Sequence, residues 1–167
     1  MTDFKYKPDG QVLKDFMRDE TFFRGVRGPV GSGKSVGCCI EVFRRALQQK
    51  PNSQGVRRSR WAIIRNTNPQ LRTTTIKTWL DWFPEADWGK FTWSVPYTHN
   101  IRKADLELEV IFLALDRPED VKKLLSTFLN KTSFLRKSVL FLFTFLTCIL
   151  LIFFAKFLSR LKCLLIS

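Results

Sequence analysis

A glycine-rich segment at residues 28–35 has the residue types and spacing that bind phosphate. It reads Gly-Pro-Val-Gly-Ser-Gly-Lys-Ser and fits the pattern G-x-x-x-x-G-K-[ST] at every fixed position. Its glycines permit backbone conformations that other residues resist, so the N–H groups can curl round an anion. Lys34 is expected to reach the β- and γ-phosphates of ATP, and the Ser35 hydroxyl to ligate Mg²⁺. The candidate phosphate site is Gly28, Gly31, Ser32, Gly33, Lys34 and Ser35.

The neighbouring sequence predicts the elements that position this loop. Residues 21–28 are expected to form a strand that ends in glycine, and residues 34–49 an amphipathic helix. The positive end of that helix would point at the same anion. We expect its apolar stripe to be Val36, Ile40, Phe43 and Leu47, and its water-facing residues to be Glu41, Arg44, Arg45 and Gln48.

The rest of the front part alternates between strand and helix patterns, which is typical of an α/β fold. Helices are expected over residues 11–20 and 73–83 and from Pro118, strands over 61–64, 91–95 and 106–115, and a loop over 66–72. The run 61–64 reads as a buried parallel strand. The single histidine, His99, lies in a polar segment and is expected at the surface. We expect Cys38 and Cys39 to be buried thiols, and no structural metal.

Hydrolysis of ATP needs an acidic residue for Mg²⁺ at the end of an apolar strand, and an acid that activates water. Asp116, after residues 110–115, is the one candidate for such a catalytic role. It is followed by Arg117 and Pro118 rather than by an acid. Its other interpretation is a helix cap, which we favour. The catalytic residues therefore stay unknown, and whether the chain is an enzyme stays open.

Composition divides the chain at residue 126. The 167 residues carry a net charge of +13, which favours a polyanionic partner. Residues 1–126 hold all 15 acidic residues and all the glycine, proline and tryptophan, whereas residues 127–167 hold 6 basic residues and no acidic one. We therefore expect an ATPase-like part over 1–126 and a hydrophobic, basic tail over 127–167.

Three segments resemble one family. They are TFFRGVRGPVGSGKS, WAIIRNTNPQLRTTTIKTWLDWFP and LEVIFLALDRPEDVKKLLS, and over about residues 10–126 they resemble the large subunit of tailed-phage terminases, the ATPase that packages viral DNA. The resemblance implies an incomplete P-loop NTPase fold, a RecA/ASCE-like parallel sheet with flanking helices. The acidic pair, the coupling motif and the nuclease domain of that family would follow residue 126 and are not found there. The chain is thus expected to be the ATP-binding front half of the motor, unable to hydrolyse ATP efficiently or to cut DNA.

The resemblance also implies ligands and partners. ATP and Mg²⁺ are the expected cofactors, and double-stranded DNA, portal protein, the small terminase subunit and further copies of the chain are the expected partners. The expected location is the host cytoplasm. Arg27 is a candidate arginine finger. Arg65 and Arg72 are similar in place to basic residues near nucleotide or DNA, although solvated loop arginines explain them equally well.

A non-enzymatic DNA-binding module is another interpretation. Arg57, Arg58 and Arg60 beside Trp61 suit phosphate contacts with a stacking ring, while the alternative, which we favour, is a solvated loop with Trp61 in the core.

The tail permits two interpretations. Residues 138–155 are 18 uncharged residues, which would span about 27 Å as a C-terminal hydrophobic helix. It is a transmembrane anchor if the tail is genuine, and out-of-frame translation otherwise, which its narrow composition favours. A genuine anchor would make the chain a membrane-anchored P-loop ATPase with Asp116 as its Mg²⁺ ligand.

Overall fold

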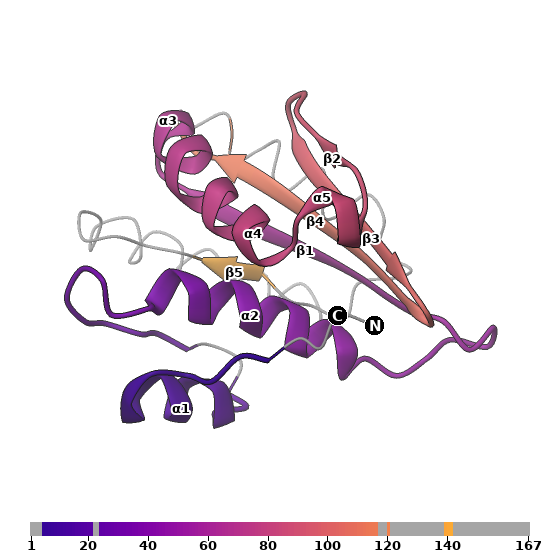
Figure 1. The fold of residues 1–167 in the computed structure, drawn as a ribbon, viewed down its shortest axis with the longest axis horizontal. Coiled ribbons are helices and arrows are strands. Elements are labelled where there is room, and N and C mark those ends of the chain that lie inside the picture. The colour runs from indigo at the N-terminus through magenta and orange to yellow at the C-terminus, as the bar shows by residue number, and fades with distance from the viewer. Residues whose placement is uncertain (1–4, 22–23, 117–119, 121–138, 142–167) are drawn as a thin grey trace, which may run out of the picture.

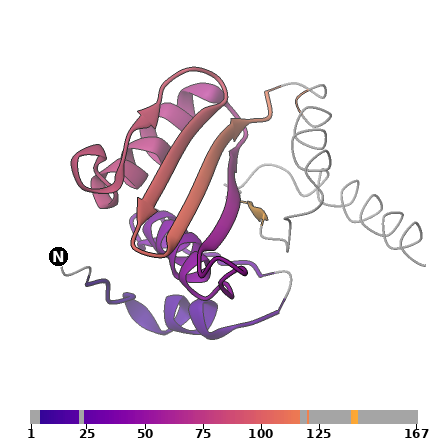
Figure 2. The ribbon, with the colours of Figure 1, turned by 90° about the vertical axis from the view of Figure 1, so that its right-hand side faces the viewer.

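The computed structural model describes residues 5–21, 24–116, 120 and 139–141 of the chain (Figure 1). It confirms an α/β fold, in which helices pack on a mixed sheet (Figure 2). The helices are α1 (Gly10–Arg18), α2 (Lys34–Leu47), α3 (Asn68–Gln70), the π-helical η1 (Leu71–Ile76), α4 (Lys77–Trp82) and α5 (Glu85–Trp88). The strands are β1 (Arg57–Arg65), β2 (Phe91–Thr92), β3 (Tyr97–Lys103), β4 (Leu106–Ala114) and β5 (Val139–Phe141).

The strands lie in the order β2-β3-β4-β1-β5. β1 and β4 form a parallel pair that runs from Arg57 opposite Leu106 to Arg65 opposite Ala114. β3 pairs with β4, and β2 with β3, in antiparallel fashion. The short β5 lies parallel to β1 beside residues 62–64. The expected parallel strand at 61–64 is therefore confirmed, and it is longer than its apolar run because cross-strand ion pairs continue it at the polar end.

The main core lies between one face of the sheet and the helices α2, η1 and α4. Alternate residues of β4, such as Leu108, Val110 and Phe112, point into it. Trp79 of α4 and Phe83, the residue that ends this helix, are fully buried there, with ring centroids 4.3 Å apart. The opposite face has a smaller apolar cluster around Ala62 and Ile64. Apolar residues on both faces explain why β1 reads as a continuous hydrophobic run.

The strand expected at residues 21–28 is not formed: Thr21 and residues 24–28 are outside regular structure. Arg24 explains this difference, because its guanidinium donates to the carbonyls of Phe16 and Asp19 and to Glu41 on α2. These bonds hold the segment beside α1 and α2. Figures 1 and 2 show α1 on the far side of α2 from the sheet, so this segment runs where no strand is available for pairing.

Two other boundaries differ from expectation. The loop expected at 66–72 ends at Thr67, whose hydroxyl accepts from the backbone N–H of Gln70 and so begins a helix with Pro69 in its first turn. The strand expected at 91–95 stops at Thr92, because the chain bends at residues 94–96 before it returns as β3. The expected helices at 11–20 and 34–49 are confirmed as α1 and α2.

Most of the tail lies outside the described residues, as does the helix expected from Pro118 except for Asp120. Of the expected hydrophobic helix at 138–155, only residues 139–141 are described, and they form β5 rather than a helix turn. None of the helices in the described part is both long and apolar enough to span a bilayer.

The surface position expected for His99 is wrong. Its segment is the strand β3, in which Tyr97, His99 and Ile101 alternate inward, and the side chain of His99 is fully buried. Trp79 Nε1 donates to His99 Nδ1 over 2.8 Å, so Nε2 carries the proton and donates to the carbonyl of Gly89 over 2.8 Å. The polar composition of this segment made the alternation of a strand hard to see in the sequence. The two hydrogen bonds satisfy both ring nitrogens of the buried imidazole.

Acid is expected to destabilise the fold through His99. Burial lowers the pKa of His99, although the Gly89 carbonyl and Glu85 oppose this shift. The unfolded chain takes up a proton near pH 6.5, whereas the native imidazole does so only at lower pH, so stability falls as the pH drops below about 6.5. Urea unfolding between pH 8 and 5 measures the effect, and the single imidazole NMR signal reports the native pKa. Constant stability from pH 7.5 to 5.5 would contradict this expectation.

Candidate phosphate-binding site

The loop at residues 28–35 has the backbone form that its glycines predict. Gly31 and Gly33 adopt φ angles of +82° and +70°, where a side chain would be strained. Gly33 is the N-cap of α2, and the backbone N–H of Gly37 donates to its carbonyl over 2.8 Å. The helix of 14 residues therefore starts directly after a left-handed turn. Its first N–H groups are aimed at the loop, as anion binding requires.

Lys34 folds back over this loop. Its ammonium donates to the carbonyl of Pro29 and to the hydroxyl of Ser32, the latter over 2.8 Å. The Ser32 hydroxyl in turn donates to the Pro29 carbonyl over 2.9 Å. The positive charge is thus held at the inner side of the loop by weak, exchangeable partners. A phosphate oxygen is a stronger acceptor for the ammonium than a carbonyl and can replace it.

The space inside the loop depends on the absence of a side chain at Gly28. A Cβ there would lie 3.2 Å from Ser32 Oγ and 3.9 Å from Lys34 Nζ. It would fill the region that the ammonium faces. Ser35, at the first turn of α2, is exposed, so its hydroxyl is accessible to a hydrated Mg²⁺. The residues of the loop therefore fit a Mg²⁺-bound polyphosphate. Among the described residues, no group of three His, Cys, Asp or Glu side chains forms a metal site by itself.

Glu41, on α2, is buried, contrary to the expectation that it faces water. Only 1 % of its side chain is exposed, and its carboxylate pairs with Arg24, Arg44 and Arg45 over 2.7–2.9 Å. Burial alone would raise the pKa of Glu41, but hydrogen bonds from the three arginines outweigh it and lower that pKa. The i, i+3 and i, i+4 spacing to Arg44 and Arg45 was the signal in the sequence. The third arginine, from outside the helix, is what made burial possible.

The same three arginines also bind the end of α1. They donate to the carbonyls of Phe16, Met17 and Asp19. These carbonyls belong to the last turn of α1 and the residue after it, where helical partners are missing and positive charge is favoured. The carboxylate on α2 and the end of α1 thus share one cluster of cations, called the Glu41 cluster below.

Asp116 caps a helix, but a different one from the helix that follows it. Both of its carboxylate oxygens accept from the backbone N–H of Asn68, at 3.3 and 3.2 Å, so it supports the start of α3. Figure 1 shows the loop before α2 and the carboxyl ends of β1 and β4 on the same side of the view. Asp116, an exposed residue, lies just beyond the end of β4.

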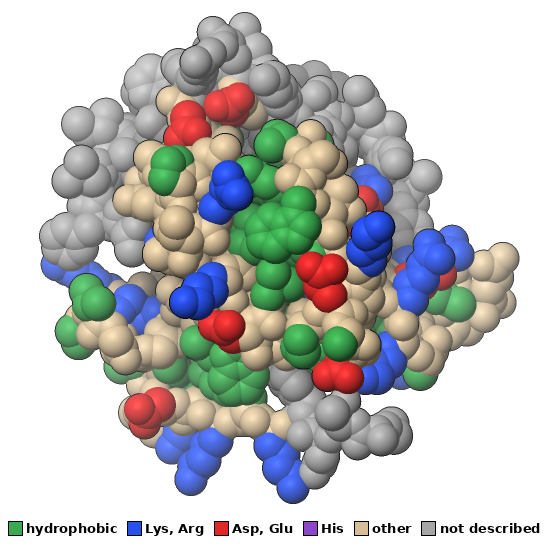
Figure 3. Space-filling view, turned by 45° about the horizontal axis from the view of Figure 1, so that its top comes forward, with side chains coloured by type: hydrophobic (Ala, Val, Ile, Leu, Met, Phe, Trp, Pro, Cys, Tyr) green, Lys and Arg blue, Asp and Glu red, His purple; other side chains and the backbone are tan. Residues whose placement is uncertain are grey.

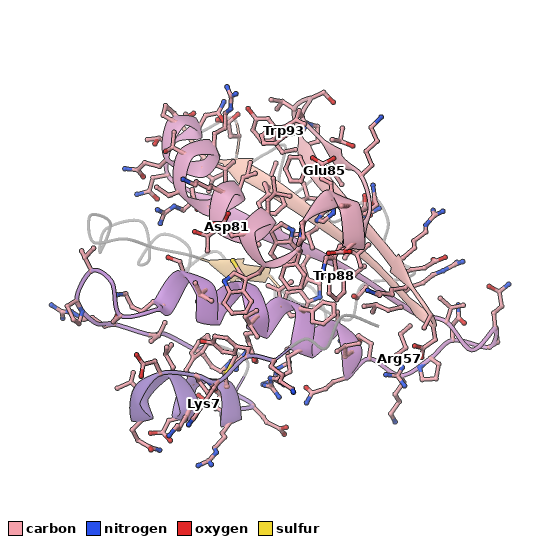
Figure 4. All side chains as sticks on the ribbon, viewed as in Figure 1. Lys7, Arg57, Asp81, Glu85, Trp88 and Trp93 are labelled. Carbon is pink, nitrogen blue, oxygen red and sulfur yellow. The ribbon has the colours of Figure 1, made fainter. Side chains whose placement is uncertain are left out.

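Of the arginines proposed for DNA contact, the three on β1 that precede Trp61 form ion pairs with carboxylates. Arg58 pairs with Glu107 over 2.5 Å and Arg60 with Glu109, both across the β1–β4 pair, and Arg57 pairs over 2.9 Å with Asp105, the residue just before β4. Figure 4 shows Arg57 at the far end of the sheet from the phosphate loop. These carboxylates reduce the field that a phosphate backbone would meet. Trp61 is buried in the core, which removes it as a stacking ring.

Arg65, Arg72 and Arg27 are not gathered into one site. Arg65 is 9 % exposed at the end of β1, donates to Thr74 Oγ1 over 3.2 Å, and has its pKa lowered by burial. Arg72 is exposed on η1, and Arg27 is exposed just before the loop. Of the three, only the last lies next to the phosphate site in sequence. In the face shown in Figure 3, acidic and basic side chains alternate around hydrophobic ones, and no large single-sign patch is formed.

Comparison with known proteins gave no identification: no protein-family model, curated protein or solved structure matches this chain.

Proposed function

We propose that the loop at residues 28–35 binds the phosphates of ATP with Mg²⁺, and that residues 1–126 act as an ATP-binding unit of the terminase large-subunit kind. The observation that carries the first part is the loop geometry: left-handed glycines lead into α2 while Lys34 faces the loop interior. A loop of this form offers several N–H donors, a helix N-terminus and one mobile cation to the same anion.

The viral DNA-packaging role rests on the resemblance of three segments, and two features of the fold are compatible with it. The second segment forms β1 and the helices after it, and the third forms β4, the parallel neighbour of β1. Both strands end on the side where the loop lies (Figure 1), and ligands of open α/β sheets bind outside the carboxyl ends of their strands.

We propose binding of ATP rather than its efficient turnover. Asp116, the only acid suggested for Mg²⁺, is engaged with the N–H of Asn68 at the start of α3. To coordinate Mg²⁺, the Asp116 carboxylate would have to release its hydrogen bonds to the N–H of Asn68. Double-stranded DNA, portal protein and the small subunit remain the proposed partners, and the host cytoplasm the proposed location, on the same resemblance.

A nucleotide series tests the proposed function. Thermal unfolding of the full chain is measured in a non-ionic detergent with AMP, ADP or ATP, each with Mg²⁺ and in excess. Ligand that binds only the native state at 100 times its Kd stabilises it by about 2.7 kcal/mol. We expect ATP and ADP to raise Tm and AMP to leave it nearly unchanged, because the loop contacts the β- and γ-phosphates. Equal shifts with all three nucleotides, or none with ATP, would refute phosphate recognition by this loop.

A further inference from the structure

We infer that α1 is a brace for the phosphate loop and that Leu13 is the positioning residue through which it acts. The inference deepens the proposed function and, for its effect on ATP, rests on it. Leu13 lies on α1, is 3 % exposed, and has its methyl groups beside the two glycines that flank the first turn of α2.

The contact is close enough to fix the position of that turn. A Cβ placed on Gly37 would lie 3.0 Å from one methyl group of Leu13 and 3.4 Å from the hydroxyl of Tyr6. A Cβ on Gly33 would lie 3.5 Å from the other methyl group. The leucine therefore packs against bare backbone at the N-cap and one turn later. Gly33 is also the left-handed residue that turns the loop into the helix.

Leu13 can fix the position of the loop only if α1 itself is held in place. The Glu41 cluster holds α1 against α2. Arg24, Arg44 and Arg45 join the end of α1 to Glu41 in the middle of α2, with charge-assisted hydrogen bonds at both ends. α1 is thus tied to α2 at one end by charge and touches its first turn through Leu13. Phe16 is buried between these two contacts.

Loss of the brace is expected to affect the loop selectively. Without the Leu13 side chain, the first turn of α2 gains room to shift, and the N–H donors of the loop move from their hydrogen-bonding distance to the phosphates. Displacement by about 1 Å weakens such interactions strongly. Leu13 lies beside the first turn of α2, and α1 lies on the far side of α2 from the sheet (Figures 1 and 2), so the backbone hydrogen bonds of β1 and β4 are expected to stay protected.

The test combines hydrogen exchange with nucleotide binding on the full chain. The variant is Leu13→Ala, the matched control is Val12→Ala on the exposed side of the same helix, and Leu13→Met is the conservative replacement. In the free protein we expect faster amide exchange over residues 28–37 in Leu13→Ala alone, with β1 and β4 unchanged. We expect Leu13→Ala to bind ATP about tenfold more weakly than wild type, and Leu13→Met to bind it nearly as wild type does.

The outcomes separate the brace from the proposed function. Unchanged exchange over residues 28–37 in Leu13→Ala, or an equal increase throughout the sheet, overturns the brace. If the wild type fails to bind ATP, the proposed function falls, while exchange still decides whether Leu13 orders the loop. Should Leu13→Ala not fold, Gly37→Ala provides the second variant, since its Cβ presses Leu13 away from the same turn; unchanged exchange over residues 28–37 there also overturns the brace.

Discussion

If the proposed MgATP binding holds, replacing Lys34 by alanine is expected to remove almost all of the stabilisation that the nucleotide gives to this chain. A hydrogen bond from a charged group contributes about 1.5–3 kcal/mol, and Lys34 is the one cation within the proposed phosphate loop, where its ammonium donates to Pro29 and Ser32. A loss near the upper end weakens binding about 100-fold. At a concentration of 100 Kd for wild type, the stabilisation would then drop from about 2.7 to about 0.4 kcal/mol.

Without nucleotide, Lys34→Ala is expected to unfold at nearly the wild-type temperature. Its partners, the Pro29 carbonyl and the Ser32 hydroxyl, lie at the surface and can bind water instead. Lys50→Ala, which removes an exposed lysine just after α2, is the matched control and should keep the full MgATP shift. The measurement is thermal unfolding with and without MgATP. Equal shifts for Lys34→Ala and wild type would exclude the proposed role of this lysine.

Glu41→Ala is expected to cost about 3 kcal/mol of unfolding free energy. Removing one member of a fully buried ion pair costs about 3–5 kcal/mol, because the remaining charge loses its partner. Here the arginine side chains retain 13–34 % exposure, so water can replace part of the lost interaction, and the low end of that range applies. The variant also loosens α1, whose last carbonyls are bound by the same arginines.

Urea denaturation at pH 7 measures this loss. Asp15→Ala is the control, because the Asp15 carboxylate on α1 accepts from Gln11 at the exposed surface, and it should change stability by less than about 0.5 kcal/mol. Glu41→Gln tests charge separately, since the amide retains size and one acceptor. A loss below about 1 kcal/mol for Glu41→Ala would mean that the cluster adds little beyond a surface ion pair.

The sequence predicted those elements whose apolar pattern determines their place. β4 and β1 contain runs of β-branched and apolar residues that are buried on both faces of the sheet. α2 directly follows a glycine turn, which marks where the helix begins. The left-handed turn at Gly31 and Gly33 and the start of α2 at Lys34 could also be predicted, because these residues lie within eight positions of the chain. Local chemistry of this kind requires no knowledge of distant partners.

The errors arose where a distant partner decided the outcome. Glu41 is buried because Arg24 reaches it from another segment, and the same arginine keeps residues 24–28 away from the sheet. His99 is buried because Trp79 and Gly89 satisfy both of its ring nitrogens. A charged or polar residue is predicted to be exposed to solvent unless its hydrogen-bonding partners are known. The spacing of residues in the sequence does not reveal partners that are distant in the chain.

The connection between β1 and β4 implies an order of assembly. β3 and β4 are joined by the two-residue turn of Ala104 and Asp105, so this hairpin can close locally, within about 1–10 μs for an isolated hairpin. Arg60 and Glu109, which face each other across the parallel pair, are 49 positions apart. Closing that long loop has an entropic cost that is recovered only when β1 docks. We therefore expect β1, and α2 which packs on it, to join late, so that the loop at residues 28–35 takes its final form only at the end of folding.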